Sequence, residues 1–407
     1  MTAPHDNLRL PGRLVGFEAA RARHGARADH MAAMLLEGDP LADAVIAELD
    51  VLGAKGRRAL TQGLTDGLAS LDGPPPAIAA LLSQLEAVPA GADQEMFAAG
   101  DRVSLLVSPF WTALAFSGGS LTHTYSSPGI ARLLAHTGEL KTTAPRRLAE
   151  TGVWNANVIL PGGLVRGAPG YVQTAQVRLL HARVRATALR HGWDTQRWGV
   201  PINQTDTART WLDFTLVPFS FLAAAGFVLD EEEQRSLYRY WHYVGRLLGL
   251  DDSFLLPIED HTGAAALLDL LDSTTEPPDD NSRALTAALF DATVTAMAQA
   301  PGSTLTEAGA RDLLDALARN HHGDETADAL GIRRSPVASA LPFLAAANAQ
   351  TRRYQTLPEA AAQEREANIQ HFRALADGLP DHTAYQKHAT PSPADEAGQA
   401  DTAATQP

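Results

Sequence analysis

A short segment centred on His181 places one imidazole beside two guanidinium groups. At about 100° per residue of an α-helix, Arg178, His181 and Arg185 fall within roughly 60° of one another. Small apolar side chains border this face: Val177, Val184 and Ala188. A neutral imidazole can ligate haem iron, apolar groups can pack on the macrocycle, and cations can pair with propionates. The spacing alone leaves a second reading open, a histidine at the edge of the core with solvated arginines.

A second group of polar residues shares one face of another expected helix. Arg147, Glu150, Thr151 and Trp154 are spaced i, i+3, i+4 and i+7 on a helix that we expect to begin near Thr143 and reach about Trp154. A carboxylate beside a guanidinium could accept or donate a proton during a reaction. On an exposed face the same pair would contribute only a few tenths of a kcal/mol to stability.

Several segments together resemble a known family. RLLHARVR at 178–185 is followed by GVPINQTD at 199–206 and an aromatic-rich helix, and GDPLADAV stands at 38–45. Thr137-Gly138 precedes Arg147-Leu148-x-x-Thr151-x-x-Trp154. This combination resembles the latex-clearing proteins, or rubber oxygenases, whose wider family includes fungal oxygenases that cleave prenyl side chains. The resemblance covers roughly residues 35–350.

The resemblance implies a haem b protein with a globin-like helical core and additional N- and C-terminal helices. It assigns the proximal iron ligand to His181, and we expect Arg178 and Arg185 to pair with the propionates. It also places the distal, catalytic residues on the helix that carries Arg147, Glu150 and Thr151. Glu150 stands where the family has a distal lysine. We therefore expect Glu150 to act as a base or to orient water and dioxygen, held by Arg147, with an open or water-filled sixth iron site.

Three functions remain open at this point. The first is a haem b-dependent dioxygenase that cleaves a carbon–carbon double bond of an apolar, isoprenoid substrate with O2 to give carbonyl products. The second is a haem protein with hydroxylase or peroxidase-type activity, and the third is a non-enzymatic haem or gas-binding protein. The N-terminal residues carry no export signal, so we expect a cytoplasmic protein and a small-molecule substrate rather than a polymer.

The elements that must position these residues read as helices, which predicts an all-α fold. Asp39 is an expected N-cap before Pro40, and Asp230 opens an aromatic-rich helix. A long helix should run from Tyr171 to His191. Another should run from Thr205 or Asp206 to Gly226, and its apolar part, residues 211–227, would wall the substrate pocket. We expect one haem-binding oxygenase domain over residues 1–375 and a disordered tail over 376–407.

Other segments receive plainer interpretations. Residues 116–120, Phe-Ser-Gly-Gly-Ser, are typical of a flexible loop, and His321-His322 of a loop at a helix end. Asp213 lies in an apolar stretch, where it would face a cofactor or pair with an arginine. His242 could be a second neighbour of the haem, but we expect a hydrogen-bonded core histidine.

Composition narrows the possible partners. The 407 residues include no cysteine, which excludes cysteine-held zinc, iron–sulfur clusters and a thiolate-ligated haem. The formal net charge of −14 leaves no excess of cations to displace phosphate counterions, so nucleic acid is not an expected partner. No apolar run reaches the length of a membrane span, so no stable membrane insertion is expected. We expect O2 and an apolar small molecule as ligands of a monomer or homodimer.

Overall fold

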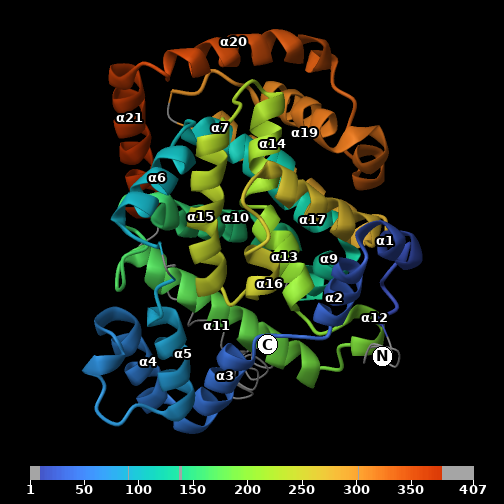
Figure 1. Cartoon of the computed structure of the whole chain (residues 1–407). Helices are drawn as coiled ribbons and strands as arrows, with labels where there is room; N and C mark the ends of the chain where they lie inside the picture. Colours follow the sequence, from blue (N-terminus) through green and yellow to red (C-terminus); the bar gives the residue numbers. More distant parts are fainter. Residues whose placement is uncertain (1–9, 90, 137–139, 301, 378–407) are drawn as a thin grey trace, which may run out of the picture.

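The computed structural model describes residues 10–377 except 90, 137–139 and 301, and these residues form helices and turns without a β-strand, which confirms the all-α prediction (Figure 1). The tail predicted over 376–407 lies almost wholly outside the described residues. The first half of the chain forms α1 (Phe17–His24), α2 (Ala26–Met34), α3 (Pro40–Leu52), α4 (Ala54–Asp66), α5 (Pro76–Glu86), α6 (Gln94–Ser104), α7 (Pro109–Leu114), α8 (Thr122–Ser126), α9 (Pro128–His136), α10 (Leu140–Ile159) and α11 (Pro169–Arg190). The second half forms α12 (Thr195–Trp198), α13 (Gln204–Leu212), α14 (Leu216–Ala224), α15 (Glu231–Leu247), α16 (Asp252–Leu255), α17 (His261–Ser273), α18 (Asp280–Gln299), α19 (Glu307–Leu330), α20 (Leu341–Tyr354) and α21 (Pro358–Asp377).

The helix boundaries that depend on local capping agree with the sequence. Asp39 accepts a hydrogen bond from the backbone N–H of Ala42 at 3.1 Å, one residue before Pro40 opens α3. Asp230 caps α15 in a capping box with Glu233. Helix α11 covers the range expected for the long helix within two residues at each end. Capping depends on residues within one turn of the helix end, so these boundaries can be predicted from the sequence without knowledge of the fold.

Other boundaries were predicted wrongly. Residues 116–120 belong to a buried π-helical segment, Ala115–Leu121, rather than to a loop. The apolar helix expected up to Gly226 breaks into α13 and α14 at 213–215, and its N-cap is Asn203. His321 and His322 are helical rather than part of a loop, but they do end the first part of α19, because Gly323 has a non-helical φ of 77° and kinks the helix there. Helix α10 starts at Leu140, so Thr143 lies within it and does not cap it.

The central helices bring distant parts of the sequence together. Helix α10 packs against α11, α18 and α21, while α15 packs against α6 and α11 against α3. Figure 1 shows α3, α4 and α5 grouped beside α11 at one end, with α20 spanning the opposite end. One hydrophobic cluster extends from Ala20 to Phe372, so the helices share a core.

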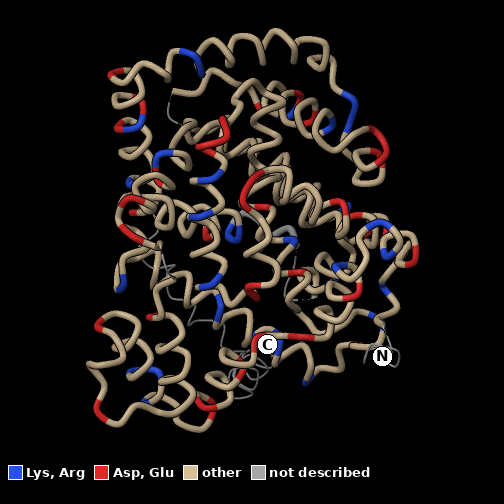
Figure 2. The backbone as a smooth tube through the Cα atoms, in the orientation of Figure 1, with Lys and Arg blue, Asp and Glu red and all other residues tan. Residues whose placement is uncertain are grey.

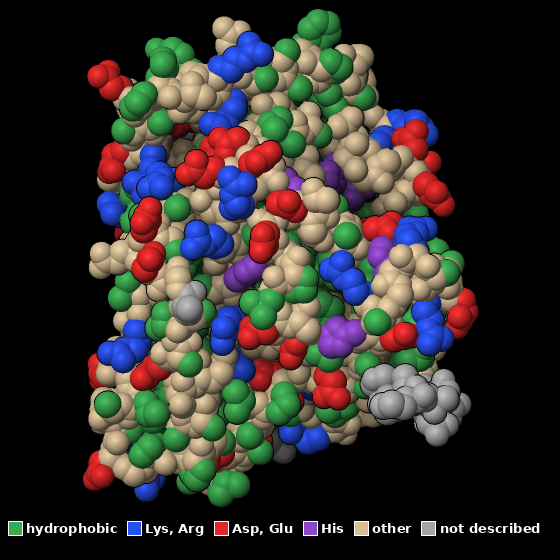
Figure 3. Space-filling view, in the orientation of Figure 1, with side chains coloured by type: hydrophobic (Ala, Val, Ile, Leu, Met, Phe, Trp, Pro, Cys, Tyr) green, Lys and Arg blue, Asp and Glu red, His purple; other side chains and the backbone are tan. Residues whose placement is uncertain are grey.

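Charged residues of both signs are spread along the helices (Figure 2) and interspersed on the face shown in Figure 3. Among the described residues, no individual helix combines the length and apolar character needed to span a bilayer. Within the described part of the chain, one bent pair of helices, 94–104 and 109–126, meets the two criteria jointly.

Candidate functional site on helices α10 and α11

Helices α10 and α11 run antiparallel, and two hydrogen bonds fix how they face each other. The Trp154 indole N–H donates to Thr174 Oγ1 at 3.0 Å, and Asn157 Nδ2 donates to Gln173 Oε1 at 3.2 Å. His181 follows Thr174 by seven residues, which is two turns, so both lie on the α11 face that meets α10. Arg147 precedes Trp154 by the same two turns. The helical repeat therefore places His181 and Arg147 at one level of the helix pair.

The His181 side chain is half-buried and makes no hydrogen bond within the described part of the chain. Desolvation, followed by repulsion from Arg185, lowers the pKa of His181 to about 4, against a smaller opposing effect of Asp39. The imidazole is consequently neutral at ordinary pH, with a nitrogen lone pair free to bind a metal.

Arg178 and Arg185 have carboxylate partners within the chain. Arg178 Nε and Nη2 donate to the two carboxylate oxygens of Asp39 at 2.6 and 3.0 Å. Arg185 Nε donates to Asp43 at 2.9 Å, and its Nη1 donates to the Ile202 carbonyl at 2.8 Å. Both guanidiniums are almost fully buried. Their pairing with propionates stays a prediction, and it would require a propionate to share or replace these aspartates.

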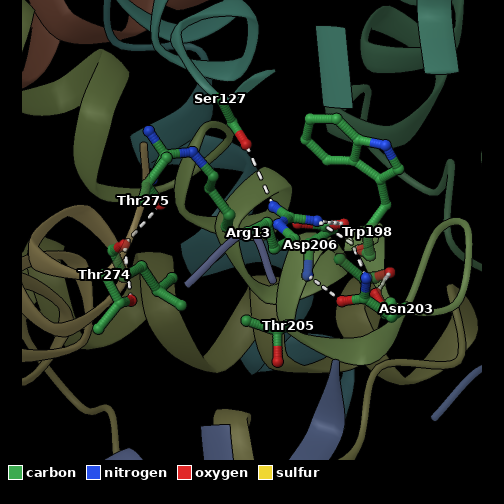
Figure 4. A network of polar contacts seen from close by, with 12 residues as sticks. Arg13, Ser127, Trp198, Asn203, Thr205, Asp206, Thr274 and Thr275 are labelled. Carbon is green, nitrogen blue, oxygen red and sulfur yellow. Dashed lines mark hydrogen bonds and ion pairs between the residues drawn. The ribbon is translucent and has the colours of Figure 1, made fainter. Parts of the chain in front are cut away.

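Three of the sequence segments that carried the resemblance, at 38–45, 178–185 and 199–206, meet around these arginines. Gln204, in the segment 199–206, connects the segment 38–45 to the end of α15. Its Nε2 donates to the Gly38 and Gly249 carbonyls at 2.8 and 3.0 Å. Figure 4 shows Asp206 bound through both carboxylate oxygens to Arg13, at 2.7 and 2.8 Å. Arg13 also donates to Ser127 Oγ at 3.3 Å (Figure 4). These contacts hold the N-terminal segment against α13 and against the start of α9.

The polar residues of α10 differ in part from the prediction. Glu150 pairs with Arg146, whose Nε lies 2.7 Å from Glu150 Oε1, so Arg146 and not Arg147 makes its ion pair. Arg147 donates to the Leu134 carbonyl at 3.3 Å, and burial lowers its pKa. Arg147, Glu150 and Thr151 are all half-buried. They share a helix face with Trp154, which contacts α11.

A separate polar cluster, the His123 node, was not predicted. His123 Nδ1 lies 2.5 Å from Asp213 Oδ1, and its Nε2 lies 3.1 Å from Asp272 Oδ1. Thr124 donates to the second oxygen of Asp213 at 2.5 Å, and Arg209 donates to Asp272 at 2.6 Å. Desolvation and Arg209 lower the pKa of His123, but the two carboxylates outweigh them and the net pKa is raised. The node ties α8, the break between α13 and α14, and α17 together.

Two further histidines lie near this node. His322 Nε2 lies 2.8 Å from the Gly118 carbonyl of the π-helical segment. His321 packs edge-on against Phe221, at 5.6 Å between ring centroids, and makes no hydrogen bond with a described residue. Desolvation lowers the pKa of both histidines, that of His321 to about 4.

The aromatic side chains next to α10 form one packed group. Phe214 stacks on Trp241 with centroids 5.4 Å apart, and Trp154 meets Phe214 edge-on at 5.0 Å. A cavity of about 30 Å³ adjoins this group. Asn155 and Ile159 of α10 and Ser104 of α6 line it together with Phe214 and Trp241.

The sequence pointed to some of the buried polar side chains but not to their hydrogen-bond partners. Asp213 stood out in its apolar stretch, but its partner is a histidine 90 residues away rather than an arginine. Asn155 carries a usable signal, because it lies one turn after Thr151 on α10 and is a polar residue among apolar neighbours.

The arrangement of helices is that of a known class of proteins. The structure of latex clearing protein LCP in the closed state matches this chain with a TM-score of 0.63 and 19% sequence identity, over 83% of this chain and 90% of that one. This similarity confirms the predicted fold class.

The family follows from a sequence profile rather than from the fold. The profile described as "ER-bound oxygenase mpaB/B'/Rubber oxygenase, catalytic domain" matches residues 101–353, and the chain belongs to this oxygenase family. A comparison with curated proteins finds no match. The matched range includes α10 and α11, and therefore both His181 and Glu150.

Proposed function

We propose that this chain is a haem b-dependent dioxygenase that cleaves a carbon–carbon double bond of an apolar, isoprenoid small molecule. One O2 and one double bond give two carbonyl groups, so both oxygen atoms are accounted for and no external reductant is required. The observation that carries the proposal is the His181 imidazole, which is neutral, half-buried and without a hydrogen bond in the described residues. Membership of an oxygenase family supports it.

The residues around His181 fit a haem. Neutral imidazole is the form that ligates iron, and His181 stays neutral above a pH of about 4. Val177 and Val184 are only half-buried, which leaves apolar surface for a macrocycle beside the imidazole. Bound there, the iron would supply the centre that activates dioxygen. The paired arginines Arg178 and Arg185 would keep α11, and thus His181, in position.

The residues of α10 would handle the proton. Glu150 presents a carboxylate whose Oε1 is held by Arg146, which leaves the other oxygen to accept an allylic proton or to orient a water molecule. Thr151, next to it, offers a hydroxyl that can donate a hydrogen bond to a substrate oxygen atom. Arg147, one helical turn before Glu150, adds a positive charge to the same face of α10.

Aromatic side chains would exclude water from the substrate. Trp154, Phe214 and Trp241 pack against one another beside α10, and each is largely buried. A pocket with such a wall favours an apolar ligand, because ligand sites are mostly apolar with few polar groups. This supports an alkene-bearing small molecule over a polar substrate.

The test starts with the absorption spectrum of the purified protein. We expect a Soret band, and its loss in His181→Ala with the protein still soluble. His191→Ala, at the exposed end of the same helix, is the matched control and should keep the band. Oxygen uptake with formation of carbonyl products from a small isoprenoid distinguishes a dioxygenase from a peroxidase or a gas-binding protein. A His181→Ala variant with full haem and an unchanged spectrum would refute the assignment.

A further inference from the structure

The cavity beside α10 continues the face that carries Thr151. Thr151, Asn155 and Ile159 are spaced four residues apart and therefore follow one another along the same side of the helix. Asn155 and Ile159 line the cavity, and Ala115 and Phe116 of the π-helical segment close another side. Such π-helical turns often occur at functional sites, because they displace backbone and side chains from a regular helix.

Two polar atoms of the cavity wall have no hydrogen-bond partner. Asn155 is 6% exposed, and its Oδ1 accepts no hydrogen bond from any described residue. Ser104 Oγ is likewise buried without a partner. An unsatisfied buried polar group typically costs about 1–3 kcal/mol, so two of them on one small cavity indicate that a bound polar group satisfies them, either an ordered water or the polar end of a ligand. Thr112, also in the wall, differs because its hydroxyl already donates to the Ser108 carbonyl at 3.1 Å.

We infer that this cavity binds the hydroxyl-bearing end of an apolar, alkene-containing substrate, an alcohol of the prenyl type. The hydroxyl would donate a hydrogen bond to Asn155 Oδ1 and accept one from Ser104 Oγ. This inference rests on the proposed function, because it names the substrate class of the same site.

The chemistry of the cavity wall favours a neutral hydroxyl over other groups. The residues that line it include no charged side chain, so a cationic or anionic end would be buried without a counterion. A carbonyl or ether oxygen cannot donate to Asn155 Oδ1, whereas a hydroxyl can both donate and accept. The volume of about 30 Å³ suits one terminal polar group and not a whole prenyl chain. The apolar remainder of the substrate would extend toward Thr151, one helical turn or about 6 Å away.

The first experiment compares two small probes with the purified holoprotein. Dimethylallyl alcohol and dimethylallyl methyl ether share the alkene, but only the alcohol can donate a hydrogen bond. Binding is measured by the change in tryptophan fluorescence, since Trp241 lines the cavity, and by calorimetry. We expect the alcohol to bind about tenfold more tightly than the ether. Equal affinities, or no binding of either probe, would overturn the inference and leave the cavity to an ordered water molecule.

Three variants test which atoms make the distinction. Ser104→Ala and Asn155→Leu should each reduce the preference for the alcohol to about threefold or less. Thr112→Val is the matched control, because it alters the same wall at a hydroxyl that is already bonded, and it should keep the full preference. A preference that survives in both Ser104→Ala and Asn155→Leu would locate the hydroxyl elsewhere.

Failure of the inference can be told apart from failure of the proposed function. Haem content and oxygen uptake are measured on the same preparations as binding. A protein that binds haem and cleaves a small isoprenoid, but does not distinguish alcohol from ether, contradicts only the inference. A protein without haem that still prefers the alcohol contradicts the proposed function and retains the site.

Discussion

The His123 node and the face between α10 and α11 both contain buried polar side chains, but they differ in how many of the polar atoms have hydrogen-bond partners. In the node, both nitrogens of His123 and both oxygens of Asp213 have partners at 2.5–3.1 Å. On the α10 and α11 face and in the cavity between α10 and α6, His181, Asn155 Oδ1 and Ser104 Oγ have no hydrogen-bond partner among the described residues. Buried polar groups that are fully matched stabilise a fold, whereas unmatched ones are costly unless a ligand satisfies them. The difference separates structural histidines from candidate ligand-binding ones.

Among the changes that test this comparison, we expect the largest effect on the free energy of unfolding from a substitution of Asp213. Asp213→Ala removes a buried carboxylate and leaves His123 Nδ1 and the Thr124 hydroxyl without this acceptor, so we expect a loss of about 3–5 kcal/mol in the free energy of unfolding. Urea denaturation measures it. Asp269→Ala is the control, because it breaks the exposed pair with Arg23 and should cost about 0–1 kcal/mol. A similar small loss in both variants would mean that the node contributes little to stability.

The second prediction concerns chemistry rather than stability. Glu150→Gln keeps the size of the side chain and removes its charge, so the variant should bind haem normally but turn over about a hundredfold more slowly. Single-turnover kinetics with a small isoprenoid measure the change. Arg146→Gln should have a much smaller effect, because its ion pair with Glu150 is partly exposed. Wild-type turnover in Glu150→Gln would remove this residue from the mechanism.

The third prediction separates two roles of Arg178. If Arg178 binds a propionate, Arg178→Ala should speed haem dissociation about tenfold or more, even where Asp39 is absent. If Arg178 only forms the ion pair with Asp39, then Arg178→Ala should leave the haem dissociation rate unchanged in the Asp39→Ala background. A double-mutant cycle on the haem dissociation rate distinguishes the outcomes. The same cycle applies to Arg185 with Asp43, which lie 2.8 Å apart.

The sequence revealed those parts of the molecule that depend on near neighbours. The caps at Asp39 and Asp230 and the extent of α11 follow from residues within one or two turns. The face shared by Arg178, His181 and Arg185 follows from helical periodicity. The spacing of residues could not show that this face lies opposite α10. That expectation came from the family resemblance, which places proximal and distal residues on these two helices.

The features that escaped prediction depend on contacts between distant residues. The π-helical segment at 115–121 contains two glycines, which favour a loop in isolation, but packing against Phe221 and Leu314 holds it in the core. The helix break at 213–215 accompanies the pairing of Asp213 with His123. The aspartate partner of Arg178 lies 139 residues earlier. No local pattern specifies such partners, because tertiary packing overrides propensity.

The smallest predicted effect tests partnered against unpartnered histidines by pH. His123 has a raised pKa because of its carboxylates, so its contribution to stability is complete below about pH 6.5 and is lost as the pH rises through its folded-state pKa. His321 has no hydrogen-bond partner in the described residues, and its pKa is about 4. The unfolded chain therefore binds more protons at this residue between pH 6.5 and 4, and stability falls as the pH falls through that window. His321→Gln should reduce the slope of unfolding free energy against pH there by at most about 1.4 kcal/mol per pH unit. Urea denaturation at several pH values measures the slope.

His123→Gln should have the opposite dependence on pH. The wild type loses the contribution of His123 as the pH rises, and the variant, which lacks that contribution, should lose less stability over the same range. An unchanged slope in His321→Gln would show that this histidine finds a proton acceptor in the folded protein, and the distinction between the two histidines would then fail.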